Sequence, residues 1–583
     1  MAGIAKRSQR LVNDFVTRNA SNPAQAAQLG MADSINIGAA FLALSAKMMA
    51  DPAKMVDAQM TLWRDYMELW RSAALKAFSG AGAPVIQADA NDRRFKDKDW
   101  QENQVFDFIK QSYLLTSRWM QSTVGEVEGL DPKTKHKVDF FTKQFVDAMA
   151  PTNFAVTNPE VLRTVAETRG ENLVKGLERL LGDLERGKGR LRVTMTDEKA
   201  FTIGVNVAST PGKVVFQNRM FQLIQYSPTT AEQKNTPIVI MPPWINKFYI
   251  LDLRDKNSLV KWLTNQGYTT FVVSWVNPDE SMAATSFEDY MLEGAIAAKD
   301  AALKATGAKQ THMVGYCIGG TLLAATLAYL KAKDDDTVAT ATYFVALTDF
   351  KEAGDLGVFI DEEQITGLEK RMDESGGFLD AADMATTFNL LRSNDLIWSF
   401  VVNNYLLGKE PFPFDLLYWN SDSTRMPKAM HSYYLRNMYL GNKLVQPGAL
   451  TLAGVPIDLR TITVPTYMIS AREDHIAPWA STYAATQIYG GPVRFVLAGS
   501  GHIAGVVNPP AAKKYNHWIN DKNPKTPEAW LKGAKDIPGS WWGDWDTWLA
   551  PQSGGKVPAR KPGAGKLKAI EDAPGSYVKA RAD

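Results

Sequence analysis

The sequence of 583 residues contains only one cysteine, Cys317, so no disulfide can form within the chain. Chains without disulfides are typical of reducing compartments, and we therefore expect a cytoplasmic protein. A strong charge of one sign is also absent, since the 65 lysine and arginine residues are balanced by 63 aspartate and glutamate residues. A balanced chain has no field that attracts nucleic acid, and we expect no nucleic-acid partner.

Long apolar runs are missing as well. Lys6, Arg7 and Arg10 are not followed closely by the apolar core of a secretory signal, so no signal peptide is expected. The most apolar early run, residues 35–50, is too short and too interrupted to span a bilayer. No group of residues has the spacing typical of a metal site, which indicates a protein without a structural or catalytic metal.

The single cysteine lies within a pattern that predicts a catalytic turn. An apolar run at 311–314 leads into Gly315-Tyr-Cys-Ile-Gly319, and an apolar helical pattern follows over 321–330. A nucleophile between two glycines, where a strand meets a helix, is held in a strained conformation that points its side chain out of the sheet. The alternative is a small core residue, the usual place of a lone cysteine. The surrounding pattern favours Cys317 as a nucleophile.

From about residue 207 the hydrophobic pattern changes from helical to strand-like. Helical patterns such as 286–305 separate the later strands, and this alternation predicts an α/β protein with a mostly parallel sheet covered on both faces. Eight strands with the nucleophile after the fifth is the order of the α/β-hydrolase fold. The predicted strands are 213–217, 222–226, 237–241, 268–275, 311–314, 342–347, 463–470 and 493–498.

Composition and period divide the rest of the chain. We predict a variable helical segment over 1–95, a helical domain over 96–205, a catalytic domain over 206–550 and a flexible basic tail over 551–583. In the first segment, apolar residues at helical spacing form a face that either packs within its own domain or meets a partner or an apolar interface. These residues are Trp63, Tyr66, Met67, Trp70, Ala74, Ala77 and Phe78.

An insert of about a hundred residues, 348–459, separates the sixth and seventh predicted strands. It is too long for a plain crossover and is rich in aromatic residues, so we predict a cap or lid over the active site. The alternative is a structural excursion. We expect the cap to move in order to admit a substrate.

The order of the fold places an acidic residue after the seventh strand. That strand is followed by Arg472-Glu-Asp-His475, and we predict Asp474 as the acid. Glu473 on the same loop and Asp349 after the sixth strand are the alternatives.

A histidine is expected after the eighth strand, and of the six histidines only His502 occupies that position. His475 lies beside the predicted acid and is expected to be structural. A free thiol has a pKa of about 8.5 and attacks as its thiolate, so it needs a base. We predict that His502 takes the proton of Cys317 and that Asp474 orients the imidazole.

Two backbone N–H groups are needed to stabilise the oxyanion of an acyl-transfer intermediate. One belongs to Ile318, the residue after the nucleophile, and the other comes from the loop after the third strand, 242–247. Within this loop we favour the N–H of Ile245. The alternative is plain packing, because no glycine-rich run or hydroxyl marks the loop.

Several of these motifs resemble those of the polyhydroxyalkanoate synthases. The motifs are Gly315-Tyr-Cys-Ile-Gly-Gly320, Pro242-Pro-Trp-Ile-Asn-Lys-Phe-Tyr-Ile-Leu-Asp-Leu253, Arg472-Glu-Asp-His-Ile-Ala-Pro-Trp479 and Gly501-His-Ile-Ala-Gly-Val-Val-Asn-Pro-Pro510. The segments 151–160 and 413–420 also match, and the resemblance covers about residues 95–583. The elbow and the acid loop look like those of the class I, short-chain type.

The resemblance implies an enzyme that polymerises (R)-3-hydroxyacyl-CoA, mainly 3-hydroxybutyryl-CoA, and releases CoA. It implies that Cys317 carries the acyl chain as a thioester and that Asp474 also helps to activate the incoming 3-hydroxyl. It further implies a homodimer at the surface of polyester granules, an N-terminal domain that contacts granules and phasins, and no metal or redox cofactor. Candidate substrate or cap contacts are Tyr418, Trp419 and Asn246.

Two rival interpretations remain at this point. The first is an acyl-CoA thioesterase or intracellular polyester depolymerase of the same fold, against which the cysteine nucleophile and the long cap argue. The second is a granule-associated scaffold with an inactive site. Replacement of Cys317 by alanine separates them, because an enzyme then loses CoA release and a scaffold keeps granule binding.

Overall fold

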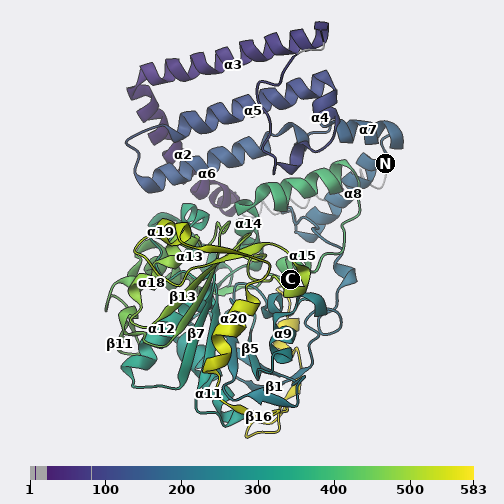
Figure 1. Cartoon of the computed structure of the whole chain (residues 1–583). Coiled ribbons are helices and arrows are strands. Elements are labelled where there is room, and N and C mark those ends of the chain that lie inside the picture. Colours follow the sequence, from purple (N-terminus) through teal and green to yellow (C-terminus); the bar gives the residue numbers. More distant parts are fainter. Residues whose placement is uncertain (1–6, 8–22, 80–81, 583) are drawn as a thin grey trace. The chain divides into compact units, whose positions relative to one another are not determined.

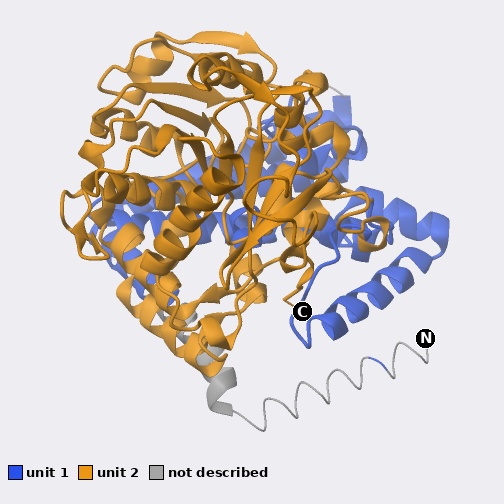
Figure 2. Ribbon diagram, turned by 90° about the horizontal axis from the view of Figure 1, so that it is seen from below, with its two compact units in different colours: residues 1–197, 388–412 blue, residues 198–387, 413–583 orange. Residues whose placement is uncertain are grey.

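The structure is a computed structural model that describes residues 7, 23–79 and 82–582, with side chains from residue 37 onward in its first long helix. The chain forms two compact units (Figure 2). The first comprises residues 1–197 and 388–412, and the second comprises residues 198–387 and 413–583. The predicted insert 348–459 is therefore not one body, since its middle part belongs to the first unit.

The first unit is helical. Its longer helices are α2 (Pro23–Ala50), α3 (Pro52–Ser79), α5 (Gln104–Gly125), α6 (Pro132–Ala148), α7 (Pro159–Thr168) and α8 (Glu171–Arg186). α3 packs along α5, α2 packs on α6, and the turn η10 (Val401–Leu406) packs on α8. Residues 1–95 and 96–197 thus share one unit instead of the two segments predicted at this boundary. None of the helices in the described ranges is long and apolar enough to cross a membrane.

One apolar face of α3 lies partly open to solvent. Tyr66 faces α5, where its hydroxyl donates to the Ser112 carbonyl oxygen at 3.3 Å. On the same side of the helix, Trp63 is 63% exposed and Trp70 is 61% exposed, although the Trp70 ring lies 4.9 Å from that of Phe108 in α5. The predicted apolar face therefore packs in part on α5, and the rest of its surface is exposed in the described part of the chain.

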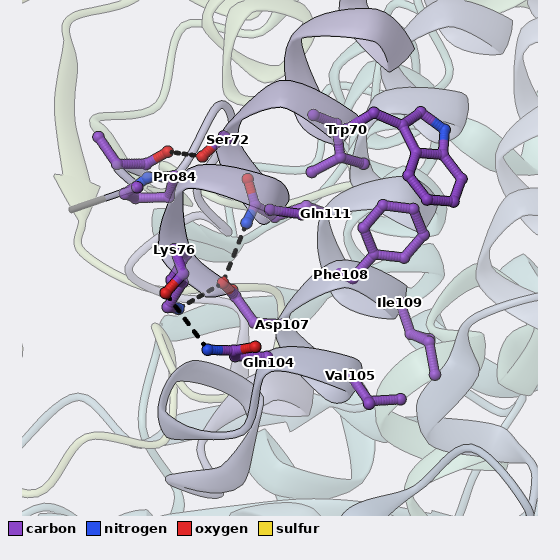
Figure 3. Close-up of a pocket in the computed structure, with 14 residues that line it drawn as sticks. Trp70, Ser72, Lys76, Pro84, Gln104, Val105, Asp107, Phe108, Ile109 and Gln111 are labelled. Carbon is purple, nitrogen blue, oxygen red and sulfur yellow. Dashed lines mark hydrogen bonds and ion pairs between the residues drawn. The ribbon is translucent and has the colours of Figure 1, made fainter. Parts of the chain in front are cut away.

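A pocket of about 290 Å³ lies between α3 and α5, beside Trp70 (Figure 3). Its polar groups are paired with one another. Lys76 donates to Asp107 at 2.8 Å, and Gln111 donates to the same carboxylate at 3.1 Å. The Lys76–Asp107 pair joins the two helices, so the pocket is part of their packing.

The second unit is built on an eleven-stranded sheet (Figure 1). Its order is β15-β14-β13-β12-β7-β6-β4-β5-β2-β1-β17, and the strands from β5 to β13 are parallel. The two strands at the far edge are β14 (Asn516–Ile519) and β15 (Lys535–Pro538). The eight predicted strands correspond to β1 (Gly212–Gln217), β2 (Phe221–Tyr226), β4 (Ile238–Met241), β5 (Thr270–Trp275), β6 (Thr311–Tyr316), β7 (Val338–Phe344), β12 (Thr466–Ala471) and β13 (Val493–Ala498). The predicted α/β-hydrolase architecture is confirmed.

Helices cover both faces of this sheet, and its strands are therefore buried on both sides. On one face, α11 (Ala297–Thr306) and α12 (Ile318–Ala332) pack in one apolar cluster. On the other face, α9 (Leu259–Asn265) and α20 (Trp542–Leu549) pack in a second cluster. β6 is completely buried between them, so the turn that follows it starts from a rigid base.

The C-terminal tail differs from the prediction of a flexible segment. β16 (Lys556–Pro558) pairs with β3 (Glu232–Lys234), and β17 (Glu571–Asp572) pairs with the edge strand β1. Val578 is only 1% exposed. The glycine, proline and lysine content of residues 551–583 predicts irregular backbone. This backbone nevertheless forms hydrogen bonds with the edges of strands in the second unit.

Candidate active site

The sharp turn predicted at Cys317 is present. Cys317 lies between β6 and α12 with φ 52° and ψ −122°, a conformation that non-glycine residues rarely adopt. A Cβ at Gly319 would lie 2.3 Å from the Met241 carbonyl oxygen, and a Cβ at Gly315 would lie 2.5 Å from the Gly320 Cα. Only glycine fits these positions, and the close packing forces the strained residue between them to present its half-buried thiol.

His502 and Asp474 meet because they follow neighbouring parallel strands, β13 and β12. The His502 Nδ1 lies 2.7 Å from Asp474 Oδ2. The other carboxylate oxygen accepts the N–H groups of Ile476 and Ala477, each at 2.9 Å. Both oxygens are engaged and the side chain is fully buried, so the carboxylate has one fixed orientation toward the imidazole.

The electrostatics of this pair favour a protonated imidazole. Burial lowers the pKa of His502, but the negative charges at Asp474 and Cys317 and hydrogen bonds to both side chains raise the pKa from 6.5 to about 10. Cys317 thus lies close enough to His502 to raise the pKa of the imidazole. The raised pKa means that the His502 imidazole holds its proton firmly beside the Cys317 side chain.

The alternatives to these residues have other contacts. The Asp349 carboxylate accepts the side-chain amide of Asn442 at 2.8 Å and stays in the loop after β7. Glu473 is exposed. The carbonyl oxygen of His475 accepts the N–H of Asp355 at 3.0 Å, and the structural role expected for this histidine stays a prediction. Of the candidates, the structure brings Asp474 to His502.

The loop 242–247 lies against the nucleophile turn, since a Cβ at Gly319 would meet the carbonyl oxygens of both Met241 and Pro242. Ile318 is the first residue of α12, and the first N–H groups of a helix have no partner within it. In the described part of the chain, the N–H groups of Ile245 and Ile318 donate to no backbone carbonyl. Both amides are thus available, and their role as oxyanion donors stays a prediction.

The second part of the insert holds this loop in place. The Thr424 hydroxyl lies 2.7 Å from the Trp244 carbonyl oxygen and 2.5 Å from that of Ile245. Asn246 forms a bridge with Ser423 of the same segment. The loop that carries the Ile245 amide is therefore fixed by residues of the insert.

Tyr418 and Trp419, predicted as substrate or cap contacts, are buried in α15 (Asp415–Ser421). The indole N–H of Trp419 donates to the Lys247 carbonyl oxygen at 2.7 Å. The Tyr418 ring lies 5.1 Å from the Phe201 ring. The Trp419 hydrogen bond anchors the insert to the loop, and contact with substrate stays a prediction for both residues.

Two tyrosines of the insert reach the site without having been predicted. Burial raises the pKa of Tyr434 and Tyr439, and the negative charge at Cys317 raises both further, so both phenols lie within electrostatic reach of the thiol. Their rings are 5.6 Å apart, and the Tyr439 ring lies 5.0 Å from that of Phe350. Leu435–Leu440 forms a π-helical turn that includes Tyr439. The two tyrosines are therefore not at the spacing that an α-helix predicts for residues on one face.

A third missed residue precedes the nucleophile. The buried hydroxyl of Tyr316 donates to the carbonyl oxygen of His502 at 3.2 Å. This contact links the strand that carries the thiol directly to the loop that carries the imidazole. The only signal in the sequence is the position of a tyrosine inside the glycine-flanked turn.

Comparison with known proteins identifies the family of this chain. Residues 91–263 match a family model described as the N-terminus of poly-beta-hydroxybutyrate polymerase, and residues 244–509 match one for the alpha/beta hydrolase fold. A poly(3-hydroxyalkanoate) polymerase of Methylorubrum extorquens is 49% identical over 91% of this chain and 88% of its own length. The chain belongs to the poly(3-hydroxyalkanoate) polymerase family. As a member of this family it is an acyltransferase.

Other polymerases of the family are similar to this chain over most of its length. The polymerase subunit of Rhizobium meliloti is 47% identical over 92% of this chain and 87% of its own length. That of Cupriavidus necator is 44% identical over 91% of this chain and 89% of its own length. The similarity to these poly(3-hydroxyalkanoate) polymerases thus extends over both units of the structure.

Proposed function

We propose that the chain polymerises (R)-3-hydroxyacyl-CoA, mainly 3-hydroxybutyryl-CoA, into polyester with release of CoA, as the class I synthases do. The observation that carries this proposal is the His502–Asp474 pair, whose Nδ1 and Oδ2 lie 2.7 Å apart, near the strained turn at Cys317 in a chain of the polymerase family. A cysteine with a histidine beside it, itself oriented by a carboxylate, is the usual arrangement of an activated nucleophile for the acyl group of a thioester.

In the first proposed step, the Cys317 sulfur attacks the thioester carbonyl of the substrate. The N–H groups of Ile318 and Ile245 would donate to the oxygen as it becomes negative. The bond between the acyl carbon and the CoA sulfur then breaks, and the His502 imidazolium gives its proton to the departing thiolate. Because one thioester replaces another, the acyl group is held at Cys317 at little cost in free energy.

In the second proposed step, the neutral His502 accepts the proton of a 3-hydroxyl group. The alkoxide attacks the thioester, an ester bond forms, and the Cys317 sulfur leaves as a thiolate. Asp474 supports both steps because its fixed carboxylate orients the imidazole and stabilises its positive charge. Neither step changes an oxidation state, so no redox cofactor is needed.

Water must be kept from the acyl thioester, because hydrolysis would end chain growth. The aromatic residues Phe350, Tyr434 and Tyr439 supply buried surface near the thiol. We propose that the insert is a cap that moves to admit CoA. A crosslink that holds the insert to the loop 242–247 should then slow turnover strongly. Unchanged turnover in the crosslinked enzyme would exclude gating.

The experiment that tests the proposed reaction uses the purified full chain and (R)-3-hydroxybutyryl-CoA. Released thiol and the fate of the acyl group are followed together. Insoluble polyester formed in step with CoA supports the polymerase. CoA release with only free 3-hydroxybutyrate would instead identify a thioesterase, since water would then be the acceptor.

We further propose that the enzyme works as a cytoplasmic homodimer at the surface of polyester granules, with phasin-type proteins as further partners. The exposed apolar face of α3, which includes Trp63, Met67 and Trp70, supports this proposal because such surfaces are typical of interaction sites. Co-sedimentation of the chain with polymer granules, and its mass in solution, test the two parts separately.

A further inference from the structure

The last described residues of the chain lie on the segments that build the candidate oxyanion loop. Figure 1 shows the C-terminus beside α15. The Lys247 ammonium donates to the Ala580 carbonyl oxygen at 2.5 Å, and the Arg425 guanidinium donates to that of Ala582 at 3.1 Å. Lys247 belongs to the loop itself, and Arg425 follows the insert residues that hold the loop. Neither cation has a part in the chemistry described above.

The contact with Ala580 satisfies a buried charge. Lys247 is only 3% exposed, and a buried ammonium is costly unless hydrogen-bond acceptors surround it. Burial lowers the pKa of Lys247, and the charge of Asp422 opposes this effect. If the Ala580 carbonyl were removed, the ammonium would lose a hydrogen-bond acceptor. Its solvation would then improve if it moved toward water. Lys247 is two residues from Ile245, so this movement would displace the Ile245 amide.

The tail is fixed immediately before these contacts. Val578 is buried in the core of the second unit. The hydroxyl of Tyr577 donates to the Asn218 carbonyl oxygen at 2.8 Å, and its N–H donates to the side-chain oxygen of the buried Gln222 at 3.1 Å. Residues 580–582 are therefore a short extension from a rigid anchor, and their carbonyl oxygens have little freedom of position.

We propose that residues 580–582, here named the C-terminal strap, position the oxyanion loop by way of Lys247, and that Lys247 is a positioning residue for acyl transfer. The proposal rests on the proposed function. The other supports of the loop, Thr424 and Trp419, belong to the insert, which is proposed to move. The Lys247–Ala580 contact involves no residue of the insert, so it is the support that stays in place when the insert opens.

The first test shortens the chain. A variant that ends at Lys579 lacks the strap, and a control that ends at Ala582 keeps every strap contact. With (R)-3-hydroxybutyryl-CoA, we expect kcat for CoA release to fall roughly 10- to 100-fold in the first variant, with KM within about twofold, because a misplaced oxyanion donor acts on the transition state. Alkylation of Cys317 by iodoacetamide should be unchanged, since the thiol and His502 keep their contacts.

The second test leaves the strap intact and removes the ammonium. Lys247→Met should reproduce the loss in kcat, and Lys247→Arg should restore much of it because it keeps a donor for the Ala580 carbonyl. This pair also decides the question if the shortened chain does not fold. A folded chain ending at Lys579 with the kcat of its control, or a Lys247→Met variant with wild-type kcat, would overturn the proposal.

These outcomes are independent of the final acyl acceptor. If the wild-type chain yields free 3-hydroxybutyrate and no polymer, the proposed polymerisation fails. The strap would still be tested, since CoA release requires the same oxyanion in hydrolysis and in polymerisation.

Discussion

Replacement of Asp474 by asparagine exchanges one oxygen for an NH₂ group, and the surrounding hydrogen bonds decide where that group points. Asp474 Oδ1 accepts two backbone N–H groups, those of Ile476 and Ala477, at 2.9 Å. The amide oxygen of the asparagine must take this position, because an NH₂ group there would face two donors. Its NH₂ group is then directed at His502 Nδ1, where the carboxylate oxygen lies 2.7 Å away in the wild type.

An NH₂ group cannot accept a hydrogen bond, so Nδ1 must become the acceptor and the proton of the neutral imidazole moves to Nε2. That tautomer cannot take the proton of Cys317. The pKa of His502 also falls from about 10, because the charge of Asp474 is one of the causes that raise it. The same exchange in a Ser-His-Asp triad reduces kcat about 10⁴-fold. Because a thiol is more acidic than a hydroxyl, we expect a reduction of roughly 10³-fold here.

The assay is rapid-quench measurement of CoA release from (R)-3-hydroxybutyryl-CoA in the first turnover. The matched control is Glu473→Gln, which makes the same chemical change at the exposed neighbouring residue and should leave the rate within about twofold. An Asp474→Asn variant that keeps more than a tenth of the wild-type rate would refute the reasoning, since the imidazole would not depend on this carboxylate for its tautomer.

Four further predictions follow from single contacts. The pKa of His502 in the folded chain, about 10, lies above its ordinary value of 6.5. The ion pair of His502 with Asp474 therefore stabilises the fold fully below pH 6.5 and ceases to do so as the pH rises through 10. In urea titrations, the difference in unfolding free energy between the wild type and His502→Gln should shrink over this pH interval. Tyr316→Phe removes the hydrogen bond to the His502 carbonyl oxygen and should lower the unfolding free energy by about 1 kcal/mol and kcat several-fold; an unchanged kcat would show that this contact does not position the imidazole. Thr424→Val should lower kcat more than KM, and Thr424→Ser should restore it, because the hydroxyl holds the oxyanion loop. Glutamate at both Trp63 and Trp70 should reduce co-sedimentation with polymer granules while CoA release in solution stays within about twofold; equal reduction of both would point to a folding defect.

The part of the site that the sequence predicts is the part built from local geometry. The turn at Cys317 needs glycine at fixed offsets, as shown by the 2.3 Å approach of a Gly319 Cβ to Met241. Asp474 and His502 follow long buried strands, β12 and β13, whose apolar runs are easily recognised. Once the order of the strands is known, the fold brings these loops to one edge of the sheet.

The parts that the sequence does not predict depend on tertiary context. Strands β16 and β17 have three and two residues, too few for any periodic pattern, and they form because edge strands β3 and β1 offer free backbone groups. Residues 388–412 look like the rest of the insert in composition, yet they pack with α8 in the first unit. Tyr434 and Tyr439 come together through a π-helical turn that apolar periodicity does not reveal.

The contacts around loop 242–247 connect admission of substrate to chemistry. The insert holds the loop through Thr424 and Trp419, whose partners are carbonyl oxygens on either side of Asn246. An insert that moves must therefore release these bonds or carry the loop with it. With the insert open, the loop keeps the Lys247 contact to Ala580 but lacks the bonds to Thr424 and Trp419, so the Ile245 amide is held less firmly and an open site that admits water stabilises the oxyanion of hydrolysis less well. The same contacts that hold the loop for acyl transfer would thus protect the thioester at Cys317 while the site is open.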